Sequence, residues 1–184
     1  MRKIFIFFLF GVLGLFVFFE YESKHPMVFK GDVGICEGDI VFQTSNSKQS
    51  PFIQHATGSK WTHCGIVVYK GDKPYVLEAS NVVKLTPFNE WKARSSNFTK
   101  ERLIDNCPKI KYKKYLGKPY DTSFRLDNDK YYCSELVYDI YKNQLGVEFK
   151  LRKVSSYNIL GLNEMLKNRG IKLNQLVIAP SDLL

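Results

Sequence analysis

Residues 129–137 read Asp-Lys-Tyr-Tyr-Cys-Ser-Glu-Leu-Val, and they place Cys133 at the start of a helix predicted over residues 133–143. Apolar residues then recur at the spacing of one helical face, namely Leu136, Val137, Ile140 and Tyr141. A thiol in the first helical turn lies at the positive end of the backbone dipole, which favours the thiolate, the nucleophilic form of cysteine. Cys133 is therefore a candidate nucleophile. The alternative is a buried structural cysteine.

A cysteine nucleophile needs a base nearby, and the sequence offers three histidines. His25 lies in a predicted linker, and His55 lies in a predicted loop or short helix. His63 lies inside an apolar strand predicted at residues 61–69, where an imidazole is either a satisfied core residue or a site residue. By alternation His63 and Gly65 share one face of that strand. Gly65 is expected to leave room on this face for the close approach of a helix or a ligand.

Glu78 is an acid in a strand, predicted at residues 75–79, that otherwise contains Tyr, Val, Leu and Ala. A carboxylate in such a strand costs free energy unless it is paired. The predicted turn at residues 70–74 brings this strand beside the strand of His63 and places Glu78 across from residues 62–65. We expect Glu78 to hold one imidazole nitrogen and to leave the other for the thiol. The alternative is an edge-strand charge that faces water.

The predicted strands and helices are separated along the chain, which indicates an α+β fold. Strands are predicted at residues 38–43, 61–69, 75–79, 82–85 and 176–179. Helices are predicted at residues 52–57, 87–91, 133–143 and 156–168. Residues 92–108 are polar and are predicted to be irregular. The expected core is an antiparallel sheet packed against the helix that carries Cys133.

Residues 1–20 have the pattern of a membrane-targeting segment. A basic start is followed by an unbroken apolar run of sixteen residues at 4–19, which is short for a bilayer span. Because no small-residue cleavage motif follows, we expect an uncleaved membrane anchor, with a cleaved signal peptide as the alternative. In both cases residues 31–184, the predicted globular domain, are exported to the cell envelope or periplasm, and residues 21–30 are the linker.

The chain has 184 residues and a formal net charge of +9. The basic residues are scattered, apart from a cluster at residues 109–114, and no nucleic-acid-binding motif accompanies them, so nucleic acid is not an expected partner. The four cysteines form no CxxC pair and the three histidines show no zinc spacing, so no metal or cofactor is expected. In an exported protein Cys36 with Cys107 is the leading candidate for a disulfide, whereas a nucleophilic Cys133 must be unpaired.

The sequence YLGKPY at residues 115–120, followed by YCSELV at residues 132–137, resembles the LGxPY…DCSGLV signature of NlpC-like cell-wall peptidases, which are papain-fold cysteine hydrolases. In those enzymes the cysteine precedes the histidine, whereas here the candidate histidine comes 70 residues before Cys133. Further segments in the same order resemble the circularly permuted YiiX-like hydrolases: GDIVF at 38–42, THCGIV at 62–67, LEA at 77–79 and IAPSDL at 178–183. The resemblance covers about residues 37–183.

This resemblance implies a circularly permuted papain-like fold in which Cys133 is the nucleophile, His63 the base and Glu78 the orienting residue. Tyr120 matches an active-site tyrosine and is implied to help bind the oxyanion. The chain departs from the signature at Tyr132, where the cell-wall enzymes often carry Asp. This departure touches none of the proposed chemistry, but it weakens the case for peptidoglycan as the substrate.

The expected function is hydrolysis of an amide or ester bond through an acyl-enzyme, without a metal. The expected substrate is a cell-envelope peptide or a lipid-linked acyl group, and residues 4–19 are the expected contact with the membrane. Two alternatives stand beside this interpretation. One is a non-catalytic, envelope-anchored binding module on the same scaffold, and the other, ranked last, is an anchored disulfide-handling protein.

Overall fold

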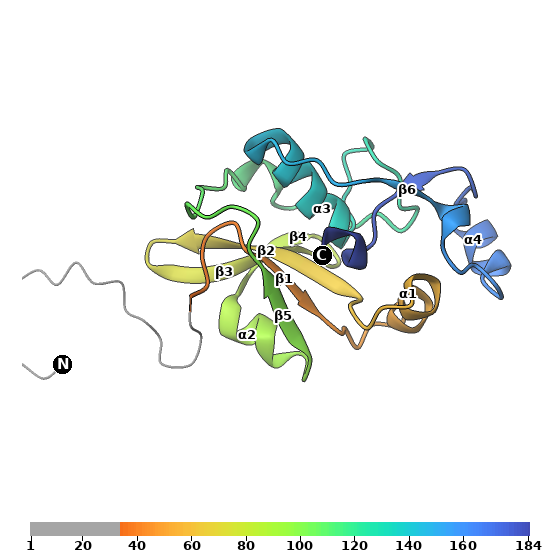
Figure 1. Ribbon diagram of the computed structural model, residues 1–184, viewed down its shortest axis with the longest axis horizontal. Helices are drawn as coiled ribbons and strands as arrows, with labels where there is room; N and C mark the ends of the chain where they lie inside the picture. Colours follow the sequence, from red (N-terminus) through yellow and green to blue (C-terminus); the bar gives the residue numbers. More distant parts are fainter. Residues whose placement is uncertain (1–33) are drawn as a thin grey trace, which may run out of the picture.

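A computed structural model describes residues 34–184 of the chain (Figure 1). The anchor predicted at residues 1–20 and the linker predicted at residues 21–30 lie outside the described residues. Within residues 34–184, no helix has the length and apolar character that crossing a bilayer requires.

The centre of the fold is a five-stranded sheet with the order β4-β3-β2-β1-β5, in which every neighbouring pair is antiparallel. Its strands are β1 (Ile40–Gln43), β2 (His63–Lys70), β3 (Lys73–Ala79), β4 (Val83–Pro87) and β5 (Phe98–Glu101). A separate two-stranded sheet consists of β6 (Arg152–Lys153) and β7 (Leu176–Val177). The sheet mixed with helices confirms the predicted α+β class.

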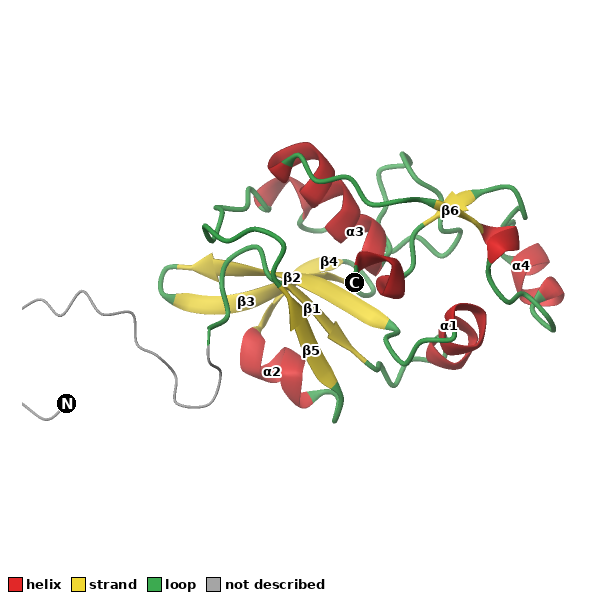
Figure 2. Cartoon of the chain, viewed as in Figure 1, coloured by secondary structure: helices red, strands yellow, loops and turns green. Residues whose placement is uncertain are grey.

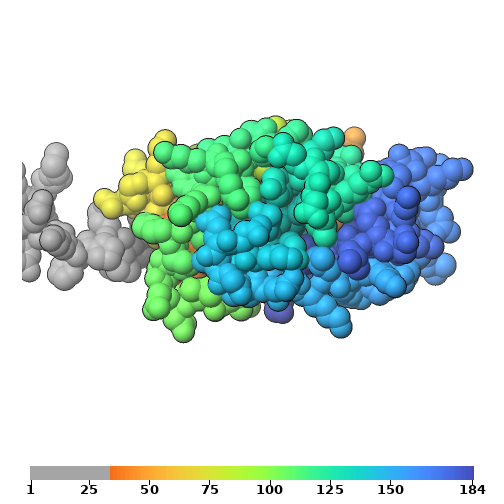
Figure 3. Space-filling view, turned by 90° about the horizontal axis from the view of Figure 1, so that it is seen from above, coloured from red at the N-terminus to blue at the C-terminus, as the bar shows by residue number. Residues whose placement is uncertain are grey.

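The described part of the chain has four α-helices around the sheets: α1 (Ser50–Thr57), α2 (Phe88–Ala93), α3 (Cys133–Ile140) and α4 (Asn163–Asn168). A π-helical turn at Tyr141–Leu145 extends α3. Single 3-10 turns occupy Lys113–Tyr115, Val154–Ser156 and Pro180–Leu183. Figure 2 shows α2 and α3 on opposite sides of the five-stranded sheet. In the space-filling view the region around α4, in blue, lies at the end of the molecule opposite the β2–β3 turn, in yellow (Figure 3).

The alternation of residues along β1 and β2 determines which helix each face of the sheet buries. The face toward α3 carries buried side chains from both strands, namely Ile40, Phe42, Cys64, Ile66 and Val68. They form one core with the apolar face of α3 and the turn after it, namely Leu136, Val137, Ile140 and Tyr141. The opposite face buries Val41, Val67 and Val76 against Phe88 and Trp91 of α2. The helical periodicity that begins at Cys133 thus fixes how α3 lies on the sheet.

Two predictions about secondary structure are wrong. Residues 92–108 are not irregular throughout, because β5 pairs with β1 at the edge of the sheet, and Phe98 in β5 packs edge-on against Trp91. The helix predicted at 156–168 is reduced to α4. The backbone N–H of Asn158 donates to the carbonyl of Ala56 in α1 at 2.9 Å, and Gly161 has a left-handed φ of 76°. These tertiary contacts take the place of a continuous helix.

The structure also tests two further expectations, the space beside Gly65 and the pairing of Cys36 with Cys107. Gly65 does not admit a helix or a ligand, because the neighbouring strand β3 occupies the space. A Cβ added at Gly65 would lie 2.4 Å from Val76 Cγ1 and 2.8 Å from the carbonyl oxygen of Leu77. The leading disulfide pair is confirmed, since Cys36 and Cys107 are bonded. Cys64 and Cys133 are free thiols, and both are buried.

Candidate active site

Cys133 is the first residue of α3, and its position is fixed by contacts on both sides of it. The backbone N–H of Tyr132 donates to Glu135 Oε2 at 3.2 Å, which caps the helix start. Ser134 Oγ donates to the carbonyl of Ile178 at 2.7 Å, and the N–H of Ile178 donates to Tyr132 Oη at 3.1 Å. The segment from β7 to the C-terminus therefore holds the turn that presents the thiol.

Glu135 lies beside this turn without adding a negative charge at neutral pH. Burial raises its pKa to about 8, against a smaller lowering by the hydrogen bond from Tyr132. A protonated carboxylic acid in the first turn caps the helix and leaves the positive end of the helix dipole available to a Cys133 thiolate.

His63, the first residue of β2, is bound to Glu78 of β3 as the strand pairing predicts. The register pairs Ile66 with Leu77, and one further step places Glu78 beside Gly65. The distance between His63 Nε2 and Glu78 Oε2 is 2.7 Å. The alternative of an edge-strand charge in water is wrong, because the Glu78 side chain is fully buried.

Four side chains satisfy the Glu78 carboxylate. Besides His63, Thr86 Oγ1 and Arg94 Nη1 donate to Oε1 at 2.6 and 2.7 Å, and Trp91 Nε1 donates to Oε2 at 3.0 Å. Burial alone would raise the pKa of Glu78, but the hydrogen bond to His63, reinforced by Thr86 and Arg94, lowers it to about 2. Glu78 is therefore ionised throughout the neutral range and holds the His63 ring in place.

The ring of His63 also lies close enough to Cys133 for each group to shift the pKa of the other, so two residues that lie 70 positions apart along the chain meet. Because Nε2 binds Glu78, Nδ1 is the nitrogen left for the sulfur. Burial lowers the pKa of His63, but the hydrogen bonds to Cys133 and Glu78 outweigh it and raise that pKa to about 9. The pKa of Cys133 lies well below its usual value. At neutral pH the pair is thus a thiolate and an imidazolium.

Cys64 is a site residue that the sequence did not reveal. It follows His63 on β2, and its thiol and backbone N–H lie close enough to the sulfur of Cys133 to lower the pKa of that thiol. The thiol of Cys64 is the largest influence that lowers the pKa of Cys133, whereas burial raises the pKa of Cys64 itself well above its usual value. Cys64 therefore stays protonated and donates to the thiolate. Strand alternation places Cys64 on the face of β2 opposite His63. The position of α3 is what brings the sulfur of Cys133 close to both residues.

Replacing Cys64 by alanine is expected to raise the pKa of Cys133, because it removes a hydrogen bond to the charged form. A hydrogen bond to a charged group contributes about 1.5 to 3 kcal/mol, so its loss should shift the titration measurably. The measurement is the rate of iodoacetamide alkylation against pH, with the adduct located at Cys133 by mass spectrometry. Cys64→Ser, which retains a donor, should remain closer to the wild type. An alkylation midpoint that does not move in Cys64→Ala would contradict this assignment.

Of the other residues singled out from the sequence, Tyr120 reaches the site, His55 does not, and the structure does not describe His25. Tyr120 lines the same cavity as Cys133. Burial, followed by the nearby charge of Cys133, raises the pKa of Tyr120 well above its usual value, so its phenol is protonated. His55 lies away from the thiol, with Nε2 2.9 Å from the carbonyl of Leu160. His25 lies outside the described residues.

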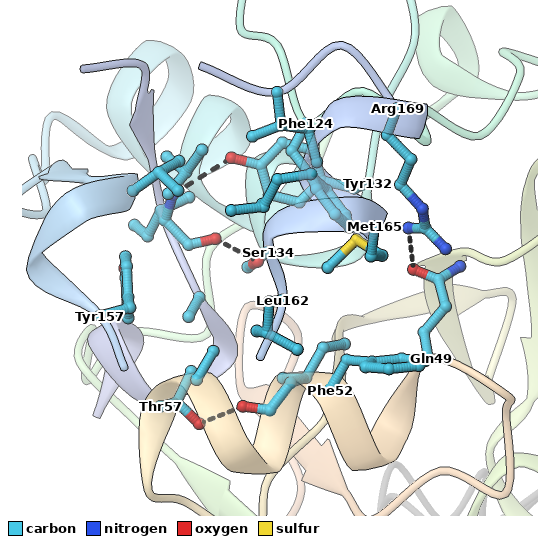
Figure 4. A pocket seen from close by; sticks show the side chains of 18 of the residues that line it. Gln49, Phe52, Thr57, Phe124, Tyr132, Ser134, Tyr157, Leu162, Met165 and Arg169 are labelled. Atoms are coloured by element: carbon cyan, nitrogen blue, oxygen red, sulfur yellow. Dashed lines mark hydrogen bonds between the residues drawn. The ribbon is translucent and has the colours of Figure 1, made fainter. Parts of the chain in front are cut away.

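Cys133 opens into a cavity with an empty volume of about 820 Å³, part of which is open to solvent. We call it the α1–α4 cavity. Most of its lining is apolar and comes from α1, α4 and the loop before α3, as in Phe52, Ile53, Phe124, Leu162, Met165 and Leu166. Figure 4 shows Phe52 and Thr57 along one wall, with Tyr132 and Ser134 across the cavity. The apolar lining suits an apolar group such as an acyl chain.

A thiol at a helix start, with an imidazole on an earlier strand and a carboxylate on the next, is the arrangement expected of a papain-like cysteine hydrolase in permuted chain order. Comparison with known proteins gives the family. Residues 35–172 match the family described as "Permuted papain-like amidase enzyme, YaeF/YiiX, C92 family", and the chain belongs to this family. This membership places the chain in the cysteine hydrolase class.

Two relatives from Escherichia coli agree with this assignment. The chain is 37% identical over 158 residues to the uncharacterized protein YiiX of strain K12, covering 78% of each sequence. It also resembles a solved structure from strain O157:H7, described as the crystal structure of metalloprotein yiiX, with a TM-score of 0.73 and 35% identity. That match covers 80% of this chain and 91% of the solved chain. The permuted fold predicted from the sequence is thereby confirmed.

Proposed function

We propose that this protein hydrolyses an amide or ester bond through an acyl-enzyme on Cys133, with His63 as the acid and base and Glu78 as the positioning residue. The observation that carries the proposal is the series Cys133–His63–Glu78, assembled from α3, β2 and β3, in which His63 is hydrogen-bonded to Glu78 and lies beside Cys133. A binding module has no need of a thiolate held beside an imidazolium. The resting ion pair makes Cys133 nucleophilic at neutral pH.

In the proposed reaction the thiolate of Cys133 attacks the carbonyl carbon and forms a C–S bond, and the carbonyl oxygen becomes an oxyanion. The phenol of Tyr120 and the backbone N–H of Cys133 donate to this oxyanion. Collapse of the intermediate expels the amine or alkoxide, which takes the proton from His63. Neutral His63 then removes a proton from water, and the resulting hydroxide attacks the thioester. Release of the carboxylic acid restores the thiolate and the imidazolium.

The solved relative from strain O157:H7 is described as a metalloprotein. Within residues 34–184 of this chain, no three or more His, Cys, Asp or Glu side chains are grouped so as to hold a metal ion. Nε2 of His63 is already bound to Glu78. These donors do not fit a metal site, so the proposed mechanism has no step through a metal.

The substrate we propose carries an apolar acyl group, and the α1–α4 cavity is the feature that favours it. Cys133 lines this cavity, so an acyl chain that fills it would place its carbonyl carbon at the sulfur. A narrow polar channel would favour a peptide, but this lining is largely apolar. A lipid-linked amide or ester is therefore preferred to a cell-wall peptide, which remains the alternative.

The cell envelope is the proposed location. The apolar run at residues 4–19 is the proposed contact with the membrane, in keeping with a lipid-linked substrate. The Cys36–Cys107 disulfide supports an oxidising compartment, because such bonds are rare in reducing cytosol.

Filling the α1–α4 cavity is expected to change the preference for chain length. With p-nitrophenyl esters from acetate to decanoate, the kcat/KM of the wild type should rise with chain length, because each buried methylene contributes about 0.8 kcal/mol. Met165→Trp should lower kcat/KM for decanoate by about tenfold or more and leave acetate hydrolysis much less affected. Met165 lines the cavity, whereas Lys167, on the same helix, is exposed and does not.

Lys167→Trp is accordingly the matched control, and it should keep the preference of the wild type. Thermal unfolding of both variants shows whether the fold is retained. Equal losses for acetate and decanoate in Met165→Trp would argue against an acyl site in the cavity. No turnover of any acyl amide or ester by the folded wild type would favour the binding module.

A further inference from the structure

Arg169 stands at one end of the α1–α4 cavity, opposite the end that holds Tyr157 and Thr57 (Figure 4). It is the residue that caps the C-terminus of α4, and its guanidinium Nη1 donates to Oε1 of Gln49 at 3.1 Å. Gln49 is the residue just before α1. The pair therefore joins the two helices that form the cavity, although 120 residues separate them along the chain.

The charge of Arg169 has no counter-ion in the described part of the chain. Of the lining residues that the structure describes, Arg169 is the only Lys, Arg, His, Asp or Glu. Its partners within residues 34–184 are the neutral amide of Gln49 and the ring of Phe124, whose centroid lies 5.8 Å from the guanidinium carbon. The side chain is half-buried. A partly desolvated cation among apolar groups gains free energy when an anion joins it.

Arg169 also lies within electrostatic reach of the reactive end of the cavity. Its positive charge lowers the pKa of Tyr120, whereas the charge of Cys133 raises the pKa of the same phenol. Tyr120, Cys133 and Arg169 all line the one cavity. A substrate bound there would meet the nucleophile, the phenol and the guanidinium together.

We propose that Arg169 is a specificity-determining residue that binds an anionic group of the substrate, a carboxylate or a phosphate. This proposal rests on the proposed function and specifies the class of substrate more closely. The substrate would combine an apolar acyl chain in the α1–α4 cavity with a negative charge close to the scissile bond. The planar guanidinium can donate two parallel hydrogen bonds to such a group. The amide nitrogen of Gln49, beside it, is a further donor.

The test measures binding separately from turnover. Calorimetry is performed on the full chain carrying Cys133→Ala, with two matched pairs of ligands: N-decanoylglycine against N-decanoylglycinamide, and 1-decanoylglycerol 3-phosphate against 1-decanoylglycerol. In at least one pair the anionic compound should bind about tenfold or more tightly than the neutral one. Adding Arg169→Gln should remove this ratio, and Arg169→Lys should retain part of it. Comparing the pairs distinguishes a carboxylate site from a phosphate site.

Arg125→Gln is the matched control, because it also removes one arginine charge, from an exposed residue that does not line the cavity. Added to Cys133→Ala, it should leave the ratio measured for Cys133→Ala unchanged. Ratios near one in both pairs, or a ratio that survives Arg169→Gln, would overturn the proposal. The same four compounds given to the wild type distinguish the two claims. Hydrolysis without anion preference refutes the role of Arg169 alone, whereas anion-selective binding without hydrolysis refutes the proposed function alone.

Discussion

Replacing Cys133 by alanine is expected to abolish hydrolysis of acyl substrates, with a loss on the order of 10⁴-fold or more in kcat, as for the removal of other catalytic nucleophiles. The physical reason is that, among residues 34–184, no neighbouring side chain can replace the thiolate. Cys64 is held in its protonated form by burial, and it lies beside the sulfur as a donor. Initial rates with p-nitrophenyl decanoate, measured for the wild type and the variant at equal concentrations, provide the measurement.

Cys133→Ser is the informative companion variant, because it keeps the shape of the side chain and removes only the readily ionised atom. It should be as inactive as the alanine variant and should retain the thermal unfolding temperature of a folded protein. Incubating the wild type briefly with a slowly hydrolysed ester should add the mass of the acyl group to the peptide that contains Cys133. If both variants hydrolyse the ester as fast as the wild type, Cys133 is not the nucleophile, and the binding-module alternative is favoured.

The local pattern of the sequence was sufficient for strands β1 to β4 of the central sheet and for the contact of that sheet with α3. The alternation along β2 and the periodicity after Cys133 depend only on which faces are buried, and both are properties of neighbouring residues. The same holds for the meeting of His63 and Glu78, since a short turn between two strands fixes which residues lie across from each other.

What the sequence could not show depends on contacts between distant segments. The edge strand β5 is polar and half-buried, so only its pairing with β1 identifies it. Asn158 leaves the predicted helix because α1 offers its backbone a partner. Cys64 becomes part of the site because α3 packs against its strand. Arg169 becomes part of the cavity because α1 lies beside its guanidinium. No periodicity in the chain carries that information.

Glu78→Gln is expected to produce the second large effect, on stability and on activity together. The pKa of Glu78 is about 2 in the folded protein, against an ordinary value of 4.5. The carboxylate therefore contributes roughly 3 kcal/mol of stability above pH 4.5, and this contribution is lost as the pH falls from 4.5 to 2. Gln keeps the shape of the side chain but leaves Arg94 and a protonated His63 without their buried anion. Urea unfolding at pH 7 should show a destabilisation of about 3 kcal/mol.

The pH dependence separates this cause from a general packing defect. At pH 3 the difference in unfolding free energy between wild type and Glu78→Gln should shrink, since much of the linkage contribution of the carboxylate is already lost there. Glu90→Gln on α2 removes one exposed negative charge and should differ little from wild type at either pH. An equal destabilisation by Glu78→Gln at pH 7 and pH 3 would indicate altered packing instead.

The same substitution should also weaken the ion pair at the active site. Without the carboxylate, the pKa of His63 falls from about 9 toward the value that burial favours, and the Cys133 thiolate loses its charged partner. Alkylation of Cys133 at neutral pH should slow, and the kcat of ester hydrolysis should fall by about 10² to 10⁴-fold. A loss of stability without any change in the alkylation profile would mean that Glu78 supports the sheet and leaves the nucleophile unaffected. Both measurements come from one purified variant, because its fold at neutral pH is checked by the unfolding curve that measures its stability.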